Sequence, residues 1–134
     1  MLVYGEQRGC ALSDFDADGR LDLVVTQNAG TTRLYKNIGG KPGLRIRLKG
    51  GVGNPAVIGA MVRLIYENRS GPAHEIHGGS GYWSQDSGAV VLGMPEPASQ
   101  VWVRWPGGKT TYSDLPSAAR EIVIEQSGSL RVAK

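Results

Sequence analysis

The feature that constrains this chain most is the segment DFDADGRLD at residues 14–22, which holds four of its 12 acidic residues. The carboxylates occupy loop positions 1, 3, 5 and 9, with glycine at position 6. Oxygen donors at alternate positions of a curling loop point to one side, and glycine permits the sharp turn that brings the carbonyl at position 7 onto an ion. Without an ion the like charges repel one another. The spacing predicts a calcium loop with these ligands: the side chains of Asp14, Asp16, Asp18 and Asp22, and the backbone carbonyl of Arg20.

The segment has three alternative interpretations besides a calcium loop. An EF-hand needs flanking helices and a bidentate glutamate at position 12, but Val25 stands there and the following segment has the pattern of a strand. Magnesium is disfavoured because it prefers octahedral sites with several retained waters. An acidic turn that is solvated without a specific ion is the third alternative, since aspartate and glycine are ordinary turn residues.

The rest of the chain favours short strands joined by tight turns. The whole chain of 134 residues contains 20 glycines and 7 prolines, and no long helical stripe. Residues 44–49, LRIRLK, alternate aliphatic with cationic side chains, and the cations are expected to face water. The same period recurs at residues 61–66 and 100–105. Shorter strands are expected at 73–77, 89–92, 110–113, 121–125 and 130–133, and the only helix candidate is the turn at 116–120.

A domain boundary is expected near residue 42, because the stretch NIGGKPG at 37–43 suits neither strand nor helix. Before it, residues 21–27 and 32–36 read as a hairpin joined by a turn at 28–30. We therefore expect an all-β chain: a propeller-blade-like hairpin with its calcium loop over residues 1–42, and a short-stranded sandwich or barrel of seven or eight strands over residues 43–134.

Several classes of protein are disfavoured. The net charge of +3 comes without any run of five basic residues, so a nucleic-acid partner is not indicated, and no apolar stretch is long enough to span a membrane. The single cysteine, Cys10, excludes an internal disulfide and is expected to be a small packing residue. The first ten residues do not have the pattern of a signal peptide, so an exported protein would carry its leader elsewhere.

Weaker signals lie in the second half of the chain. His74 and His77 are expected on opposite faces of a strand, which disfavours a shared metal. The glycine-rich segment 78–82 fails the register of a serine hydrolase, and Asn68 begins a glycosylation sequon in an expected turn. A surface for sugar stacking and hydrogen bonding is the functional interpretation of residues 79–86, whereas large aromatics in a small β-domain are more often core residues. The candidate ligand-binding residues there are Tyr82, Trp83, Gln85 and Asp86.

Two family resemblances follow from these motifs. Residues 14–22, followed by LVV at 23–25 and LYKN at 34–37, resemble the FG-GAP or VCBS repeat, a calcium-loop blade of β-propellers. From residue 43 onward, IRLKG at 46–50, IGA at 58–60, GSGY at 79–82 and VRWPGG at 103–108 resemble the ASPIC/UnbV domain, whose family includes the cartilage acidic proteins. In that family the domain follows propeller repeats at the C-terminal end of exported proteins.

The resemblance implies the same five calcium positions and gives no catalytic residue. It also implies that upstream propeller repeats pack against the hairpin, because a lone repeat cannot bury the faces it shows to its neighbours. The expected function is a non-enzymatic calcium-binding module that is secreted, periplasmic or on the cell surface, and that serves adhesion or recognition of a protein or glycan. The alternative is an accessory domain of a carbohydrate-active or other exported enzyme.

Overall fold

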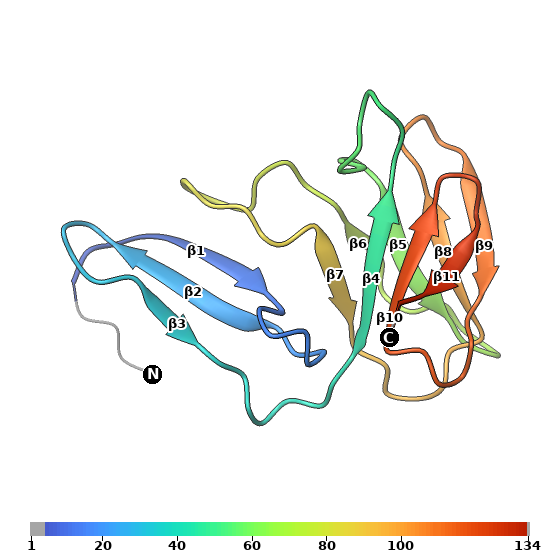
Figure 1. The fold of residues 1–134 in the computed structure, drawn as a ribbon, viewed down its shortest axis with the longest axis horizontal. Coiled ribbons are helices and arrows are strands. Elements are labelled where there is room, and N and C mark those ends of the chain that lie inside the picture. Colours follow the sequence, from blue (N-terminus) through green and yellow to red (C-terminus); the bar gives the residue numbers. More distant parts are fainter. Residues whose placement is uncertain (1–4, 134) are drawn as a thin grey trace.

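The computed structural model describes residues 5–133, and its regular secondary structure over that range consists of strands only. The strands form three sheets, one of three strands and two of four. Figure 1 shows the three-stranded sheet beside the other two, with the connection to β4 running along the bottom of the view. Within the described part, no helix has the length and hydropathy needed to cross a membrane.

The N-terminal sheet has the order β1–β2–β3, and both of its strand pairs are antiparallel. Its strands are β1 (Gln7–Ser13), β2 (Asp22–Gln27) and β3 (Arg33–Tyr35). The predicted β2–β3 hairpin is present. Strand β1 was not predicted: its sequence, QRGCALS, contains a glycine, and its register shifts between Gln7 and Gly9, so it has no regular alternation that sequence analysis can detect.

The remaining strands form two four-stranded sheets, in the orders β11–β10–β4–β7 and β6–β5–β8–β9. The strands of the first are β4 (Leu44–Lys49), β7 (Ala89–Leu92), β10 (Glu121–Glu125) and β11 (Leu130–Val132). Those of the second are β5 (Met61–Ile65), β6 (His74–Glu75), β8 (Gln100–Arg104) and β9 (Thr110–Asp114). Five of the six strand pairings in these two sheets are antiparallel, and the sixth, between β4 and β10, is parallel. Each predicted strand is present, although β6 is reduced to two residues.

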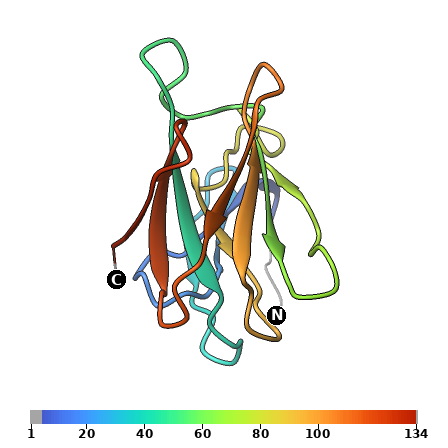
Figure 2. The same ribbon diagram turned by 90° about the vertical axis from the view of Figure 1, so that its right-hand side faces the viewer.

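One hydrophobic core lies between these two sheets and takes side chains from both. Figure 2 shows the sheets face to face. Neither closes on itself, so of the two architectures expected, the sandwich is the one formed. The alternating faces predicted for residues 61–66 and 100–105 are confirmed, because the inward side chains are all nearly inaccessible: Val62, Leu64, Tyr66, Val101, Val103 and Trp105.

Two sequence-based expectations are wrong. Arg45 of β4 does not face water: its side chain is only 11% exposed, because the aspartate loop covers it. Cys10 is exposed rather than packed. The turn at residues 116–120, a helix candidate too short to stand alone, is present as a turn with a hydrogen bond from the Ala119 amide to the Pro116 carbonyl.

Candidate calcium site

The aspartate loop, residues 14–21, connects β1 to β2. Asp14 follows the last residue of β1, and Asp22 is the first residue of β2. Gly19 at loop position 6 has a φ of +85°, so the sharp turn predicted from the sequence is present. A side chain at this position would also meet the Gly43 carbonyl and Pro42, each 3.1 Å from an added Cβ. The loop is therefore both tightly curled and closely packed against the linker to β4.

The loop brings its three carboxylates close together. One oxygen from each of Asp14, Asp16 and Asp18 lies within 4.8 Å of the others. Calcium binds oxygen at about 2.3–2.6 Å, so two ligands on opposite sides of an ion are about 5 Å apart. The three oxygens thus have the chemistry and the spacing of donors around one hard cation. Asp14 is buried, Asp18 is half-buried and Asp16 is exposed.

Backbone amides hold this arrangement. The Asp18 amide donates to Asp14 Oδ1 at 3.0 Å, and the Gly19 amide donates to Asp14 Oδ2 at 3.1 Å. The Arg20 amide donates to Asp18 Oδ1 at 2.9 Å. These bonds curl the chain back over its own first residue, which brings alternate side chains to one side as the spacing predicted.

Asp22, the predicted ligand at position 9, is placed differently. It is 1% exposed, and its two oxygens accept hydrogen bonds from the amides of Phe15 at 3.1 Å and Asn37 at 2.8 Å. The carboxylate thereby ties the start of the loop to the end of the hairpin. It is not in the group of three, although each of its oxygens has a second lone pair to offer an ion.

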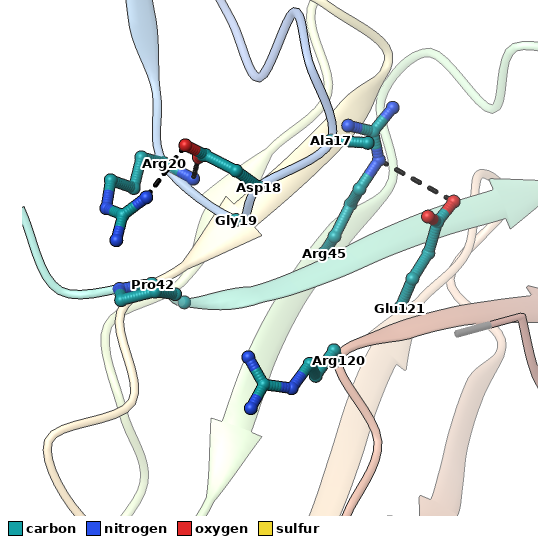
Figure 3. Close-up of a pocket in the computed structure, with 9 residues that line it drawn as sticks. Ala17, Asp18, Gly19, Arg20, Pro42, Arg45, Arg120 and Glu121 are labelled. Atoms are coloured by element: carbon teal, nitrogen blue, oxygen red, sulfur yellow. Dashed lines mark hydrogen bonds and ion pairs between the residues drawn. The ribbon is translucent and has the colours of Figure 1, made fainter. Parts of the chain in front are cut away.

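Sequence reasoning missed three basic side chains that pair with the three clustered carboxylates. Arg45 pairs with Asp14, Lys36 with Asp16 and Arg20 with Asp18. Figure 3 shows the Arg20–Asp18 contact, in which Nη1 lies 2.7 Å from Oδ2. No periodic signal could have found these pairs, because the partners come from the loop, from the chain after β3 and from β4.

These pairs change the electrostatics of the loop. The hydrogen bond from Lys36 lowers the pKa of Asp16, and Asp16 in turn raises the pKa of Lys36. All three carboxylates of the loop therefore have a positive partner, whereas Asp22 at the start of β2 accepts backbone amides. This relieves most of the like-charge repulsion that the sequence alone suggested.

The aromatic loop, residues 79–86, contains the four other candidate residues. Tyr82 is 62% exposed and Trp83 is 88% exposed, with ring centroids 6.0 Å apart, so neither is a core residue. Gln85 is exposed as well. Asp86 has a structural contact: its Oδ1 accepts the Leu12 amide at 2.7 Å, and the next residue donates its amide to the Leu12 carbonyl. The loop is thus fastened to β1, and Figure 1 shows it reaching over that strand.

Histidine does not contribute to a metal group here. Within residues 5–133, the group formed by Asp14, Asp16 and Asp18 is the only one of three or more potential ligands. The imidazole of His77 lies 3.8 Å from a carboxylate oxygen of Glu75, and both side chains are well exposed. Of the metal positions considered from the sequence, only the aspartate loop therefore has a donor set.

The chain is an all-β protein in which a β-sandwich follows a small sheet that carries an aspartate loop. Residues 50–131, more than half of the chain, match the family described as ASPIC and UnbV, and the chain belongs to that family. The matched region covers most of the sandwich and begins after the aspartate loop. The family predicted from the sequence motifs is thereby confirmed for the sandwich.

The chain is also similar to three relatives named cartilage acidic protein 1. It is 33% identical to the Homo sapiens protein over 129 residues, which are 90% of this chain and 19% of that protein. The Mus musculus protein is 33% identical over 129 residues, 90% of this chain and 20% of the relative. The Xenopus tropicalis protein is 33% identical over 112 residues, 78% of this chain and 17% of the relative. The chain therefore spans about a fifth of the length of these relatives.

Proposed function

We propose that this chain is a non-enzymatic, calcium-stabilised recognition module of an exported protein. The observation that carries the proposal is the convergence of the Asp14, Asp16 and Asp18 oxygens within 4.8 Å in a loop held by its own backbone amides. The Arg20 carbonyl, Asp22 and water are the further oxygens available to bring an ion to the six or more ligands that calcium takes.

The basic partners of the loop indicate a weak site. A bound cation must compete with Lys36 for Asp16 and with Arg20 for Asp18. Because these ion pairs must be weakened, the net free energy of cation binding is less favourable. Calcium sites with dissociation constants of about 0.1–1 mM are filled outside cells and empty inside them. A weak site therefore supports a secreted, periplasmic or cell-surface location.

We further propose that the N-terminal sheet is an FG-GAP/VCBS-type blade whose packing partners are propeller repeats of a longer chain. The register places Leu12, Leu23 and Tyr35 in one row across the sheet, and Ala11, Val24 and Leu34 in the row on the opposite face. Leu12 is 40% exposed and Leu34 is 47% exposed, so both faces still offer apolar surface. Propeller blades are four-stranded sheets covered on both faces, which is what such rows require.

The aromatic loop is the proposed recognition surface for a protein or glycan. Trp83 is held at a φ of +52°, a conformation that costs a non-glycine residue roughly 1–2 kcal/mol. Backbone strain of this kind gathers at functional sites, where the surrounding contacts enforce it. The anchoring of Asp86 and the following residue on Leu12 provides such contacts. Exposed, fixed aromatics suit both stacking on sugars and insertion into a protein pocket.

Calorimetric titration of the chain with calcium, paired with thermal melts, tests the proposal. Calcium should bind the parent chain and the control Asp114→Asn, which changes an exposed carboxylate in β9. It should not bind Asp16→Asn combined with Asp18→Asn. At about 100 times the dissociation constant, calcium should stabilise the parent by about 2.7 kcal/mol. Neither heat nor a melting shift in the parent would overturn calcium binding.

The recognition surface needs a separate test. A glycan array and a panel of extracellular proteins should be probed with the parent chain and with Tyr82→Ala combined with Trp83→Ala. Binding that disappears in the variant supports recognition through the aromatic loop. Binding that is unchanged in the variant contradicts it, and turnover of a glycoside by the parent would favour an enzyme accessory role instead.

A further inference from the structure

A cavity of about 320 Å³ lies between the aspartate loop and the sandwich. Figure 3 shows that the loop and its neighbouring linker form one wall and that strands β4 and β10 form the other. Its volume is near the lower end of the range for small-molecule sites, about 300–1,000 Å³. The cavity is lined by Ala17, Asp18, Gly19, Arg20, Pro42, Gly43, Arg45, Arg120 and Glu121.

The charged groups of this cavity are paired with one exception. Arg20 pairs with Asp18 at 2.7 Å, and Arg45 pairs with Asp14 at 2.9 Å. Glu121 is held from outside the cavity by Arg47, whose Nε lies 2.8 Å from its Oε1. The guanidinium of Arg120 has no hydrogen bond or ion pair to any residue in the range 5–133. One positive charge in the lining is therefore uncompensated.

The backbone around Arg120 is fixed although its side chain is exposed. The Arg120 carbonyl accepts the Arg45 amide at 2.9 Å, and the preceding residue, Ala119, is buried. Figure 3 shows the Arg120 side chain pointing to the side of the cavity where Pro42 and Arg20 lie. Arg20 is itself held in place, because its Nε donates to the Gly40 carbonyl at 2.7 Å. Both guanidinium groups thus border the same space, Arg20 held by its own contacts and Arg120 attached to a fixed backbone.

We propose that this cavity binds a small organic acid through a single carboxylate group, with Arg120 as its main partner and Arg20 as the second. Guanidinium presents a planar fork of donors that matches the two oxygens of a carboxylate. Arg45 is not available, because it is buried against Asp14 and Glu121.

The two acidic residues of the cavity favour a ligand with a single negative charge. Asp18 and Glu121 already have basic partners, so the second charge of a dianion, such as phosphate above its second pKa, would meet no unpaired cation in the lining. A monoanion satisfies Arg120 without a second, unpaired charge. The site goes beyond the proposed calcium loop and recognition surface, and it needs neither of them.

A nuclear magnetic resonance titration of the nitrogen-15-labelled chain tests the site. The probe is glucuronate, and its neutral amide, glucuronamide, is the matched control. The buffer is freed of metal by a chelating resin rather than by a soluble polycarboxylate, which would compete. We expect saturable shifts at the side-chain signals of Arg20 and Arg120 and at the amides of residues 17–20. Glucuronamide and inorganic phosphate should each bind at least about fivefold more weakly.

Two variants make the test specific. Arg120→Gln should weaken glucuronate binding at least about fivefold, and Arg120→Lys should restore part of it by keeping the charge. Arg131→Gln, which removes an exposed arginine of β11 outside the cavity, should bind as the parent does. Because Arg120 is exposed, its variants keep the fold, which the amide spectrum verifies directly. Equal binding of acid and amide, tighter binding of phosphate, or unchanged binding in Arg120→Gln would overturn the proposal.

Discussion

Arg45 Nη1 donates to the backbone carbonyl of Asp14 at 2.8 Å and also lies 2.9 Å from Oδ2 of the same residue. The Arg45 side chain is 11% exposed and that of Asp14 is 1% exposed, so the contact is largely withdrawn from water. Arg45 belongs to β4, an interior strand of its sheet. Through this one pair, the first residue of the aspartate loop is joined to the sandwich.

Replacing Arg45 by methionine should destabilise the chain by about 3 kcal/mol. The loss of one partner leaves a buried carboxylate without its counter-ion, which typically costs about 3–5 kcal/mol, and Asp14 keeps two amide hydrogen bonds that moderate the effect. Urea denaturation in metal-free buffer measures it. Arg47→Met is the control in the same strand, because the Arg47 side chain is 53% exposed and its loss should cost less than about 1 kcal/mol. Equal costs for the two variants would contradict the assigned role of Arg45.

Arg45 also shows which features of the structure could not be predicted from the sequence. The alternation of LRIRLK predicted β4 and its buried face, Leu44 and Ile46, because that face depends only on the local period. It also predicted that Arg45 faces water, which is wrong because residues 31 positions earlier cover it. For the same reason the sequence predicted the donor residues of the aspartate loop but not Arg45 and Lys36 as their basic partners, which packing between separate elements brings in.

The contact between the aromatic loop and β1 should depend on Asp86. Asp86→Ala removes the acceptor of the Leu12 amide, and we expect a loss of about 1 kcal/mol, since this is one partly exposed hydrogen bond. Hydrogen exchange at the Leu12 amide should be about five- to tenfold faster in the variant. Gln85→Ala, at the neighbouring exposed position, is the control and should leave that rate unchanged. Unchanged exchange in Asp86→Ala would show that the backbone bond from Ser87 alone secures the loop.

The Asp16–Lys36 pair predicts a pH dependence in metal-free buffer. Because the hydrogen bond from Lys36 lowers the pKa of Asp16 from its ordinary value of 3.8, the folded chain holds the ionised form more strongly than the unfolded chain does. The resulting stability is present above pH 3.8 and is lost as the pH falls through the folded pKa. Lys36→Met should move the pKa of Asp16 back toward 3.8, as carbon-13 NMR of the carboxyl group would show. An Asp16 titration curve that is the same in both proteins would contradict the pairing.

Trp83 should be a residue at which stability and recognition oppose each other. Asparagine tolerates a positive φ better than tryptophan does, so Trp83→Asn should raise the free energy of unfolding by about 0.5–1 kcal/mol. The same change should abolish any binding through the aromatic loop. Tyr82→Asn is the control, because Tyr82 is not among the residues with positive φ and should gain no stability. A loss of stability in Trp83→Asn would mean that the exposed ring packs in solution.

Asp18 connects the proposed calcium loop to the proposed carboxylate site, because it is a candidate calcium ligand and also the partner of Arg20. Calcium at the loop would share the Asp18 charge and add two positive charges beside the cavity, so the positive charge of Arg20 would become available to a bound carboxylate. Saturating calcium should therefore tighten glucuronate binding at least about fivefold, and glucuronate should tighten calcium binding by the same factor, because binding linkage is reciprocal.

Calorimetric titrations of each ligand in the presence of the other measure both factors. In Arg20→Gln the calcium effect on glucuronate should shrink, while calcium binding itself should persist, since that side chain is not a ligand. Equal glucuronate affinities with and without saturating calcium would contradict the coupling. In that case Asp18 would keep its full contact with Arg20 while it binds the ion, and the two sites would act independently even though they share a residue.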